Sequence, residues 1–153
     1  MANRSLIQAE RVVRLAPTAV FAWAGGVKIL HPSAFLQDLE TYQLFPAVAA
    51  LLIASYLPWL EVMAAVGLWI PALRRGAALL LLGLTVGFLI VIGVSWARGL
   101  DLSCGCLGAS SVTTAAGYAQ LVARDVAILV ALSFLVWAGR QSRMAFEATR
   151  RPA

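Results

Sequence analysis

Charged residues are scarce in this sequence. Only 12% of its 153 residues are charged, whereas 61% are hydrophobic, and the mean hydropathy is +0.86. This composition excludes an ordinary soluble globular domain and indicates an integral membrane protein. The 12 basic residues outnumber the 7 acidic ones. No basic stripe is interleaved with aromatic residues, so we expect the lipid bilayer, and no nucleic acid, as a partner.

Metal-ligating residues are equally few. The sequence has two cysteines and one histidine. A structural zinc site or an iron–sulfur cluster needs four ligands, which this set does not supply. Two thiolates, with His31 as a third ligand, would suit a soft ion such as Cu(I), and this alternative stays open. We assign no metal site from the sequence.

Four long apolar segments account for most of the chain. They cover about residues 15–30, 44–73, 76–97 and 118–138. Crossing a bilayer takes roughly 20 residues, so four spans leave room for short connections and for no separate soluble domain. We therefore predict an all-α integral membrane protein, one domain over residues 1–153 that forms a four-transmembrane-helix bundle. The second segment is too long for one upright crossing, and Pro46 and Pro58 predict either a kink in it or a separate interfacial piece.

The basic residues predict the orientation of the bundle. Nine of the 12 flank the apolar segments on one side, which the positive-inside rule makes cytoplasmic. Both termini are then inside, and the loop between the third and fourth spans is outside. We expect a multi-pass protein of the bacterial cytoplasmic (inner) membrane. The nine residues are Arg4, Arg11, Arg14, Arg74, Arg75, Arg140, Arg143, Arg150 and Arg151.

Both cysteines lie in this outer loop, in the stretch LSCGCLG. Cys104 and Cys106 are separated by one glycine. An extracytoplasmic compartment permits disulfides. A disulfide between residues this close would close a very short ring, which gives little entropic stabilisation and stores strain. Strained, exposed disulfides are labile, which favours a redox-active pair. A static disulfide that shapes the loop, a metal site and inert thiols remain as alternatives.

Five further polar residues are candidates for a site beside the cysteine pair. Arg98 and Asp101 precede the pair, Arg124 and Asp125 begin the fourth span, and Lys28 lies near the outer end of the first. Cations near a thiol favour the thiolate, which is the attacking species in exchange. The structural alternative for the basic residues is snorkelling to the lipid headgroups.

Glu61 needs its own explanation, because it lies within the second apolar segment. An ionisable side chain at that depth is costly and usually faces the bundle interior with a partner. We expect Lys28 or Arg124 as that partner. Glu61 then serves either as half of a structural pair, or as a protonated carboxyl, or in proton handling or ligand contact.

Four motifs together resemble the MauE/DoxX-like membrane proteins. They are WAGGVKILHPSAF, LPWLE, RGLDLSCGCLG and LVARDVAIL, in that order along the chain. The resemblance implies a four-helix bundle distantly comparable to quinone-linked thiol oxidoreductases. In this family, MauE is associated with maturation of methylamine dehydrogenase, a periplasmic enzyme with many disulfides, beside a thioredoxin-like partner. Carried over, it implies Cys104 and Cys106 as redox residues, with Lys28, Glu61, Arg98 and Arg124 as matching polar positions.

The cysteine spacing departs from that of the quinone-linked oxidases. Oxidases of the vitamin K epoxide reductase type use a Cys-x-x-Cys centre and usually a second cysteine pair as a shuttle, whereas this chain has one Cys-x-Cys pair. It needs an external thiol partner or a quinone acting directly, so quinone is the cofactor we consider. One hypothesis is thiol–disulfide exchange with a thioredoxin-like or cysteine-rich client. The other is a non-catalytic accessory or assembly subunit of a larger membrane complex, with a static Cys104–Cys106 disulfide.

Overall fold

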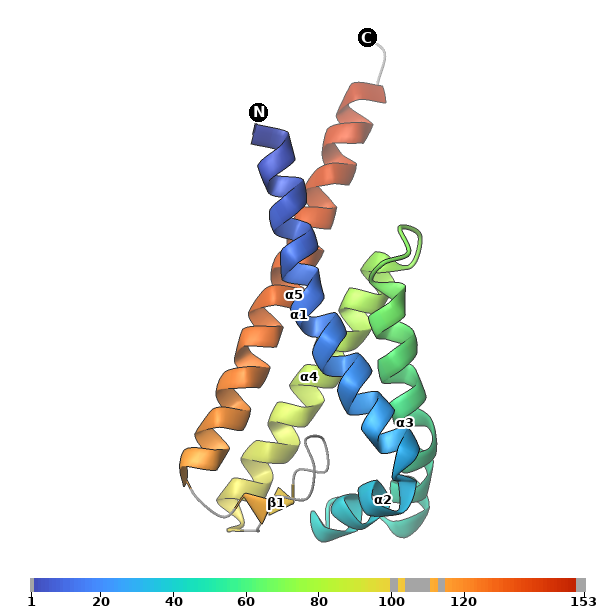
Figure 1. Cartoon of the computed structure of the whole chain (residues 1–153), viewed down its shortest axis with the longest axis vertical. Coiled ribbons are helices and arrows are strands. Elements are labelled where there is room, and N and C mark those ends of the chain that lie inside the picture. The colour runs from blue at the N-terminus through green and yellow to red at the C-terminus, as the bar shows by residue number, and fades with distance from the viewer. Residues whose placement is uncertain (1, 100–101, 104–110, 113–114, 151–153) are drawn as a thin grey trace.

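The computed structural model describes the backbone of residues 2–99, 102–103, 111–112 and 115–150, and the side chains of residues 11–99 and 119–139. Figure 1 shows these parts as long helices with one small strand pair. The helices are α1 (Ala2–Leu30), α2 (Pro32–Thr41), α3 (Ala47–Gly67), α4 (Arg74–Ala97) and α5 (Ala115–Arg150), and the strands are β1 (Leu102–Ser103) and β2 (Ser111–Val112).

Four of the helices are long and apolar enough to cross a membrane. The spans are Arg11–Leu30 in α1, Ala47–Gly67 in α3, Arg74–Ala97 in α4 and Ala119–Gly139 in α5. Each has 20 or more residues, which matches the thickness of a bilayer core. The predicted four-helix membrane bundle is therefore confirmed.

The ends of the chain lie together at one end of the bundle. Figure 1 shows both termini at the end that also carries the connection between α3 and α4, while α2 and the strand pair lie at the opposite end. Arg74 and Arg75 begin α4 beside that connection. This is the arrangement that four crossings with both termini inside require.

The long second apolar segment is divided between a helix and a turn. Pro46 is the N-cap of α3 in an extended conformation, and the helix ends at Gly67. Residues 68–73 then form a hydrogen-bonded turn that leads into α4. Pro58 lies inside α3. Because proline has no N–H, one helical hydrogen bond is missing there. The kink itself stays a prediction.

The largest buried cluster lies in the half of the bundle near the α3–α4 turn. Alanines of α3 and α4 face one another there, and larger side chains of α1 and α5 close the space around them. Small residues let helices approach closely, which is how helices pack in lipid. The buried members are Phe21, Ala64, Ala65, Leu68, Ala77, Ala78, Leu81, Ile128, Leu132 and Leu135.

A polar contact joins α1 to the turn at this same end. The Trp69 indole Nε1–H donates to Thr18 Oγ1 over 3.1 Å, and the Thr18 hydroxyl donates to the Arg14 carbonyl oxygen over 2.9 Å. The Arg14 guanidinium lies 5.7 Å from the centre of the Trp69 ring, within the range of a cation–π interaction. The turn is thus fixed against α1.

Gly25 sets how α1 lies on α3. A Cβ added at Gly25 would be 2.8 Å from Val62 Cγ2 and 2.9 Å from the Pro58 carbonyl oxygen, so only glycine fits this crossing. Residues three apart lie on one helix face. Lys28 therefore follows Gly25 on the face toward α3, and Glu61 follows Pro58 on the facing side of α3.

The polar stretch after the first span forms a helix, α2, at the end of the bundle opposite the termini, hereafter the outer end (Figure 1). Pro32 occupies its first turn, a favourable place for proline. Phe35 and Leu39, four residues apart, are buried against Ala50 and Ala54 of α3. The sequence predicted only short connections between the spans, and the apolar face of this stretch was not recognised there.

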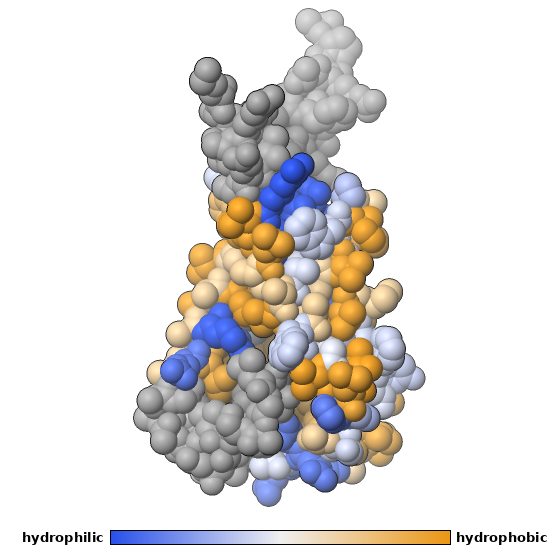
Figure 2. Space-filling model, viewed as in Figure 1, coloured by the Kyte–Doolittle hydropathy of each residue, from blue (hydrophilic) through white to orange (hydrophobic). Residues whose placement is uncertain are grey.

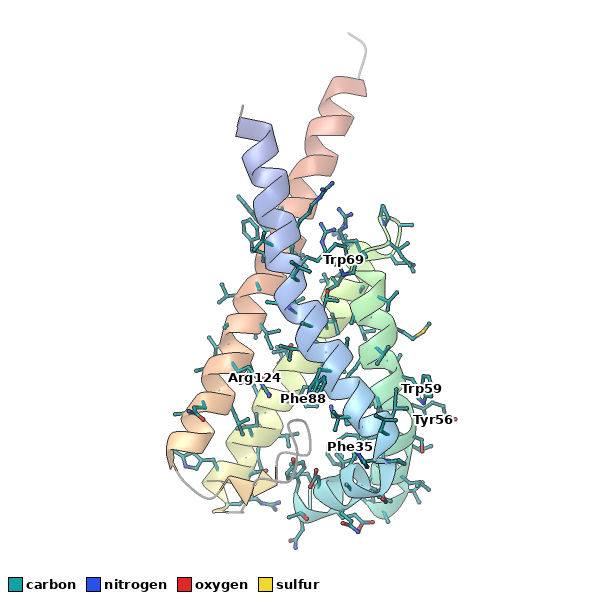
Figure 3. The ribbon with its side chains drawn as sticks, in the orientation of Figure 1. Phe35, Tyr56, Trp59, Trp69, Phe88 and Arg124 are labelled. Atoms are coloured by element: carbon teal, nitrogen blue, oxygen red, sulfur yellow. The ribbon has the colours of Figure 1, made fainter. Side chains whose placement is uncertain are left out.

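The surface of the spans is largely apolar. Figure 2 shows hydrophobic residues over the flank of the bundle, with hydrophilic ones gathered toward both ends of the coloured part. Tyr56 and Trp59 of α3 are 66% and 58% exposed and point outward in Figure 3. Both residues lie near the middle of the span Ala47–Gly67, so their exposed rings face the lipid.

Candidate functional site: an intramembrane cavity with two ion pairs

A buried ion pair connects α1 to α3. Lys28 Nζ donates to Glu61 Oε1 over 2.6 Å, and the two side chains are 1% and 0% exposed. The crossing at Gly25 brings them together. Of the two partners expected for Glu61, the structure places Lys28 against it. Ionisable groups at this depth are tolerated when they are paired in this way.

Two aromatic rings complete the surroundings of the ammonium group. Lys28 Nζ lies 4.9 Å from the centre of the Phe35 ring on α2 and 4.7 Å from that of Phe88 on α4. A cation beside an aromatic face out of water gains about 2 kcal/mol. Lys28 thus links four elements: it stands on α1, pairs with α3 and contacts rings of α2 and α4.

A second ion pair lies within α5. Arg124 Nε donates to Asp125 Oδ1 over 2.9 Å, and Arg124 Nη2 is 2.8 Å from the same oxygen. The Asp125 side chain is 5% exposed and that of Arg124 29%. The other carboxylate oxygen, Asp125 Oδ2, is buried and has no hydrogen-bond partner among the described side chains.

Both ion pairs line one cavity of about 280 Å³ within the span region. Figure 3 shows Phe88 and Arg124 on the inner sides of α4 and α5, and Phe35 on α2 at the outer end. All five helices contribute to the wall, which is mostly apolar. Besides the charged groups and the two rings, it includes Val20, Phe21, Ala24, Leu39, Tyr42, Phe45, Ile53, Leu57, Gly83, Leu84, Thr85, Gly87, Val91, Ile92 and Ile128.

The cavity exists because α3 and α4 diverge. They are close at their connecting turn, where a Cβ at Gly67 would lie 3.1 Å from Ala77 Cβ. Figure 1 shows them separating toward the outer end, where α2 lies beside α3. Phe35 and Leu39 of α2 fill part of this wider end. The result is a pocket that is closed toward the termini.

The structure brings together four of the eight candidate site residues. Lys28, Glu61, Arg124 and Asp125 line the cavity. Arg98 is exposed at the C-cap of α4 and is not part of the lining. The remaining three, Asp101, Cys104 and Cys106, lie outside the described residues, so their roles stay predictions.

The flanks of the cysteine segment are described, although the segment is not. β1 and β2 pair antiparallel, with Leu102 opposite Val112 and Ser103 opposite Ser111. β1 also contacts α2, which lines the cavity. The residue directly before Cys104 therefore belongs to a strand at the outer end of the bundle, near α2.

Several contributors to the site were not identified in the sequence. Phe35 and Phe88 belong to apolar stretches in which many residues could have faced inward. The spacing of Phe35 and Leu39 was the available signal for α2, because apolar residues four apart share a helix face. His31, considered as a third metal ligand, is exposed at the N-cap of α2. The described residues contain no group of three His, Cys, Asp or Glu side chains placed to hold a metal ion.

Comparison with known proteins gives one family. Residues 7–138 match the model of the family described as methylamine utilisation protein MauE. The chain is also similar to the methylamine utilization protein MauE of Methylophilus methylotrophus, with 35% identity over 89 residues. That alignment covers 58% of this chain and 47% of the relative, so the match spans about half of the relative's length. No solved structure matches the chain.

Proposed function

The chain belongs to the MauE family, and from this premise we propose that it is a membrane protein that exchanges disulfides with an extracytoplasmic client at Cys104 and Cys106. The client is a thioredoxin-like or cysteine-rich protein, and the exchange supports maturation of an extracytoplasmic enzyme in methylamine utilisation. The observation that carries the proposal is the extent of the family match. It includes the cysteine pair and all four residues of the two ion pairs.

The exchange balances as a transfer of two electrons and two protons. A client thiolate attacks one sulfur of the Cys104–Cys106 disulfide, forming a mixed disulfide and releasing the other cysteine as a thiolate. The second client thiolate then attacks the mixed disulfide, which leaves the client oxidised and the pair reduced. A membrane quinone would supply the sink for those electrons and protons. Arg98, Asp101 and Arg124 have supporting roles in this proposal, the two arginines by favouring a leaving thiolate.

The alternative is an accessory or assembly subunit whose cysteine pair is a static clip. The pairing of β1 with β2 favours it, because both flanks of the cysteine segment are held by backbone hydrogen bonds. Association with a partner protein is part of both functions. The two differ in whether the cysteines react.

Trapping with single-cysteine variants separates the two functions. With Cys104→Ser or Cys106→Ser, the remaining thiol can attack a client disulfide, and no second thiol is present to release the adduct. We expect a covalent adduct that reducing agent dissolves. The double variant is the matched control and should trap nothing and lose function. Full function in both single variants without an adduct would exclude exchange and leave the accessory subunit.

The localisation that this function needs is the cytoplasmic membrane, with the cysteine segment outside. The supporting pattern is the nine basic residues at the terminus-bearing side. After mild reduction of intact cells, a membrane-impermeant maleimide should label Cys104 or Cys106 in the wild type, and not in the double cysteine variant. Labelling only after lysis would contradict the orientation.

A further inference from the structure

One carboxylate oxygen in the cavity has no hydrogen-bond partner among the described residues. Asp125 is 3% exposed, and Arg124 binds only its Oδ1. Oδ2 is buried, and no described side chain donates to it. An unsatisfied buried acceptor is costly, more so for a charged group, and calls for a donor. Asp125 lines the cavity, so a ligand there is placed to supply that donor.

Two glycines line one wall of the cavity, although no close contact with a described residue requires glycine there. Gly83 and Gly87 of α4 line the cavity and are exposed, one helical turn apart. A Cβ added at either would meet nothing within 4 Å, unlike Gly25. Small residues in a span normally permit close helix packing, but no described helix packs against these two. They leave this part of the wall thin, and both are exposed.

The remaining wall fits a flat, lipid-soluble head. Five aromatic residues line a volume of about 280 Å³, which is within the size of a ring with short substituents and too small for a whole phospholipid. These residues are Phe21, Phe35, Tyr42, Phe45 and Phe88. Besides the two ion pairs, the polar side chains of the lining are Tyr42 and Thr85, and the Thr85 hydroxyl already donates to the Leu81 carbonyl oxygen, so a ligand has few hydrogen bonds to make.

We propose that this cavity binds an aromatic hydroxyl group carried by a lipid-soluble molecule, which enters past Gly83 and Gly87 and donates its O–H to Asp125 Oδ2. The rings beside Lys28 stack on the ligand's ring. The shared chemistry is that of a membrane hydroquinone or a phenolic lipid.

The requirement for a donor gives the site a preference. A hydroquinone carries two O–H groups, whereas the corresponding quinone has only carbonyl acceptors and cannot donate to Asp125 Oδ2. The cavity therefore binds the reduced ring more tightly than the oxidised one. This step deepens the proposed function, because it assigns a place to the product of a quinone-linked exchange, but the binding itself needs no cysteine.

Binding is measured with the Cys104→Ser/Cys106→Ser protein, so that failure of thiol exchange does not affect the result. The probe is radiolabelled 4-nonylphenol, a lipid-soluble phenol without redox chemistry, with the purified full chain in dodecylmaltoside micelles. We expect saturable binding that unlabelled decylubiquinol displaces at lower concentration than decylubiquinone. If unlabelled 4-nonylphenol displaces the probe and neither ubiquinone compound does, the ligand is a phenolic lipid. If decylubiquinol displaces it at lower concentration than decylubiquinone, the ligand is a hydroquinone.

Glycine variants test the entrance. Gly83→Leu/Gly87→Leu should fold, because both positions are open, and should weaken binding about tenfold or more by filling the wall. Gly76→Leu/Gly93→Leu is the matched control, since these α4 positions are equally open and do not line the cavity. Equal binding by the two double variants would overturn the proposal.

Asp125→Asn tests the acceptor. The amide can still accept from Arg124 through its oxygen and then presents NH₂, a donor, to the cavity. The preference for decylubiquinol over decylubiquinone should disappear or reverse, a change of about tenfold or more in the ratio. Glu40→Gln, an exposed acid of α2 outside the lining, should leave the ratio unchanged. An unchanged ratio in Asp125→Asn, or nonylphenol that binds no variant including the parent, would refute the site.

Discussion

The two halves of this bundle are held together by different means. In the half near the α3–α4 turn, alanines of both helices belong to one buried apolar cluster, and Arg14, Thr18 and Trp69 add polar contacts beside it. In the outer half, α3 and α4 diverge around a cavity, and the Lys28–Glu61 pair and the ring contacts of Lys28 connect the helices. Close packing of small residues suffices where nothing must enter. Space for a ligand has to be kept open by contacts that reach across it.

The two halves also differ in what stabilises them. In lipid, apolar side chains gain little from leaving the solvent, so helix association depends on packing and on polar contacts. The half near the α3–α4 turn (the closed half) relies mainly on packing, with the Arg14–Trp69 contacts added at its edge. The outer half depends on Lys28, whose removal would affect contacts to three other helices at once.

Breaking the Lys28–Glu61 pair should have the largest effect. Glu61→Gln leaves the ammonium buried without its counter-charge, and we expect a loss of about 3–5 kcal/mol in unfolding free energy. Lys28→Met/Glu61→Leu removes both charges and should recover most of it, because a well-packed apolar pair avoids desolvation. The measurement is the thermal unfolding midpoint in detergent. An unchanged midpoint in Glu61→Gln would contradict a structural role for the pair.

Truncating a core residue compares the two halves directly. Leu132 is 0% exposed in the closed half, and Leu132→Ala should cost about 2–5 kcal/mol because it leaves a void in packed surroundings. Leu57→Ala is the matched change at the cavity, where the side chain is only half-buried and packs with the α2–α3 cluster. It should lower the unfolding midpoint clearly less. Equal losses would mean that the outer half is packed as tightly as the other.

Enlarging Gly25, at the crossing of α1 and α3, should have the next largest effect on stability. Gly25→Ala places a methyl group 2.9 Å from a backbone oxygen of Pro58, and overpacking of this kind costs about 1–3 kcal/mol. Gly26→Ala is a stringent control, since a Cβ at this neighbouring residue meets nothing within 4 Å. Thermal unfolding of both variants should show a loss for the first and none for the second. A larger loss of stability in Gly26→Ala than in Gly25→Ala would contradict a helix crossing at Gly25.

The polar contact at the turn should contribute least. Trp69→Phe removes the donor to Thr18 and keeps a ring beside Arg14, so we expect a loss of about 0.5–1.5 kcal/mol. The same thermal measurement, with Trp59→Phe as a lipid-facing control, isolates the hydrogen bond. A loss as large as that of Leu132→Ala would show that the turn is held mainly by Trp69.

Hydropathy predicted the spans because a bilayer imposes length and composition on each helix separately. The four membrane-crossing helices and their order needed no tertiary information. The sequence did not predict α2, because tertiary contacts determine which of its residues are buried. Its buried face consists of Phe35 and Leu39 within a polar stretch, and their burial depends on Ala50 and Ala54 of another helix.

The candidate site was predictable only in part. Lys28, Glu61 and the Arg124–Asp125 pair stand out in a sequence with so few charges, because a charge in a span needs a partner. The rings of Phe35 and Phe88 carry no such signal among many apolar neighbours. The second oxygen of Asp125 became notable only once its surroundings were known.

The sequence by itself determined that this chain crosses the bilayer four times and that Glu61 requires a partner, because lipid penalises each charge and each unpaired backbone group wherever it lies in the fold. Only the tertiary structure decided that Lys28, 33 residues away, is the partner. The choice follows from the crossing at Gly25 and Pro58, which aligns one face of α1 with one face of α3. The cavity likewise follows from the divergence of α3 and α4, a relation between helices that neither segment specifies alone.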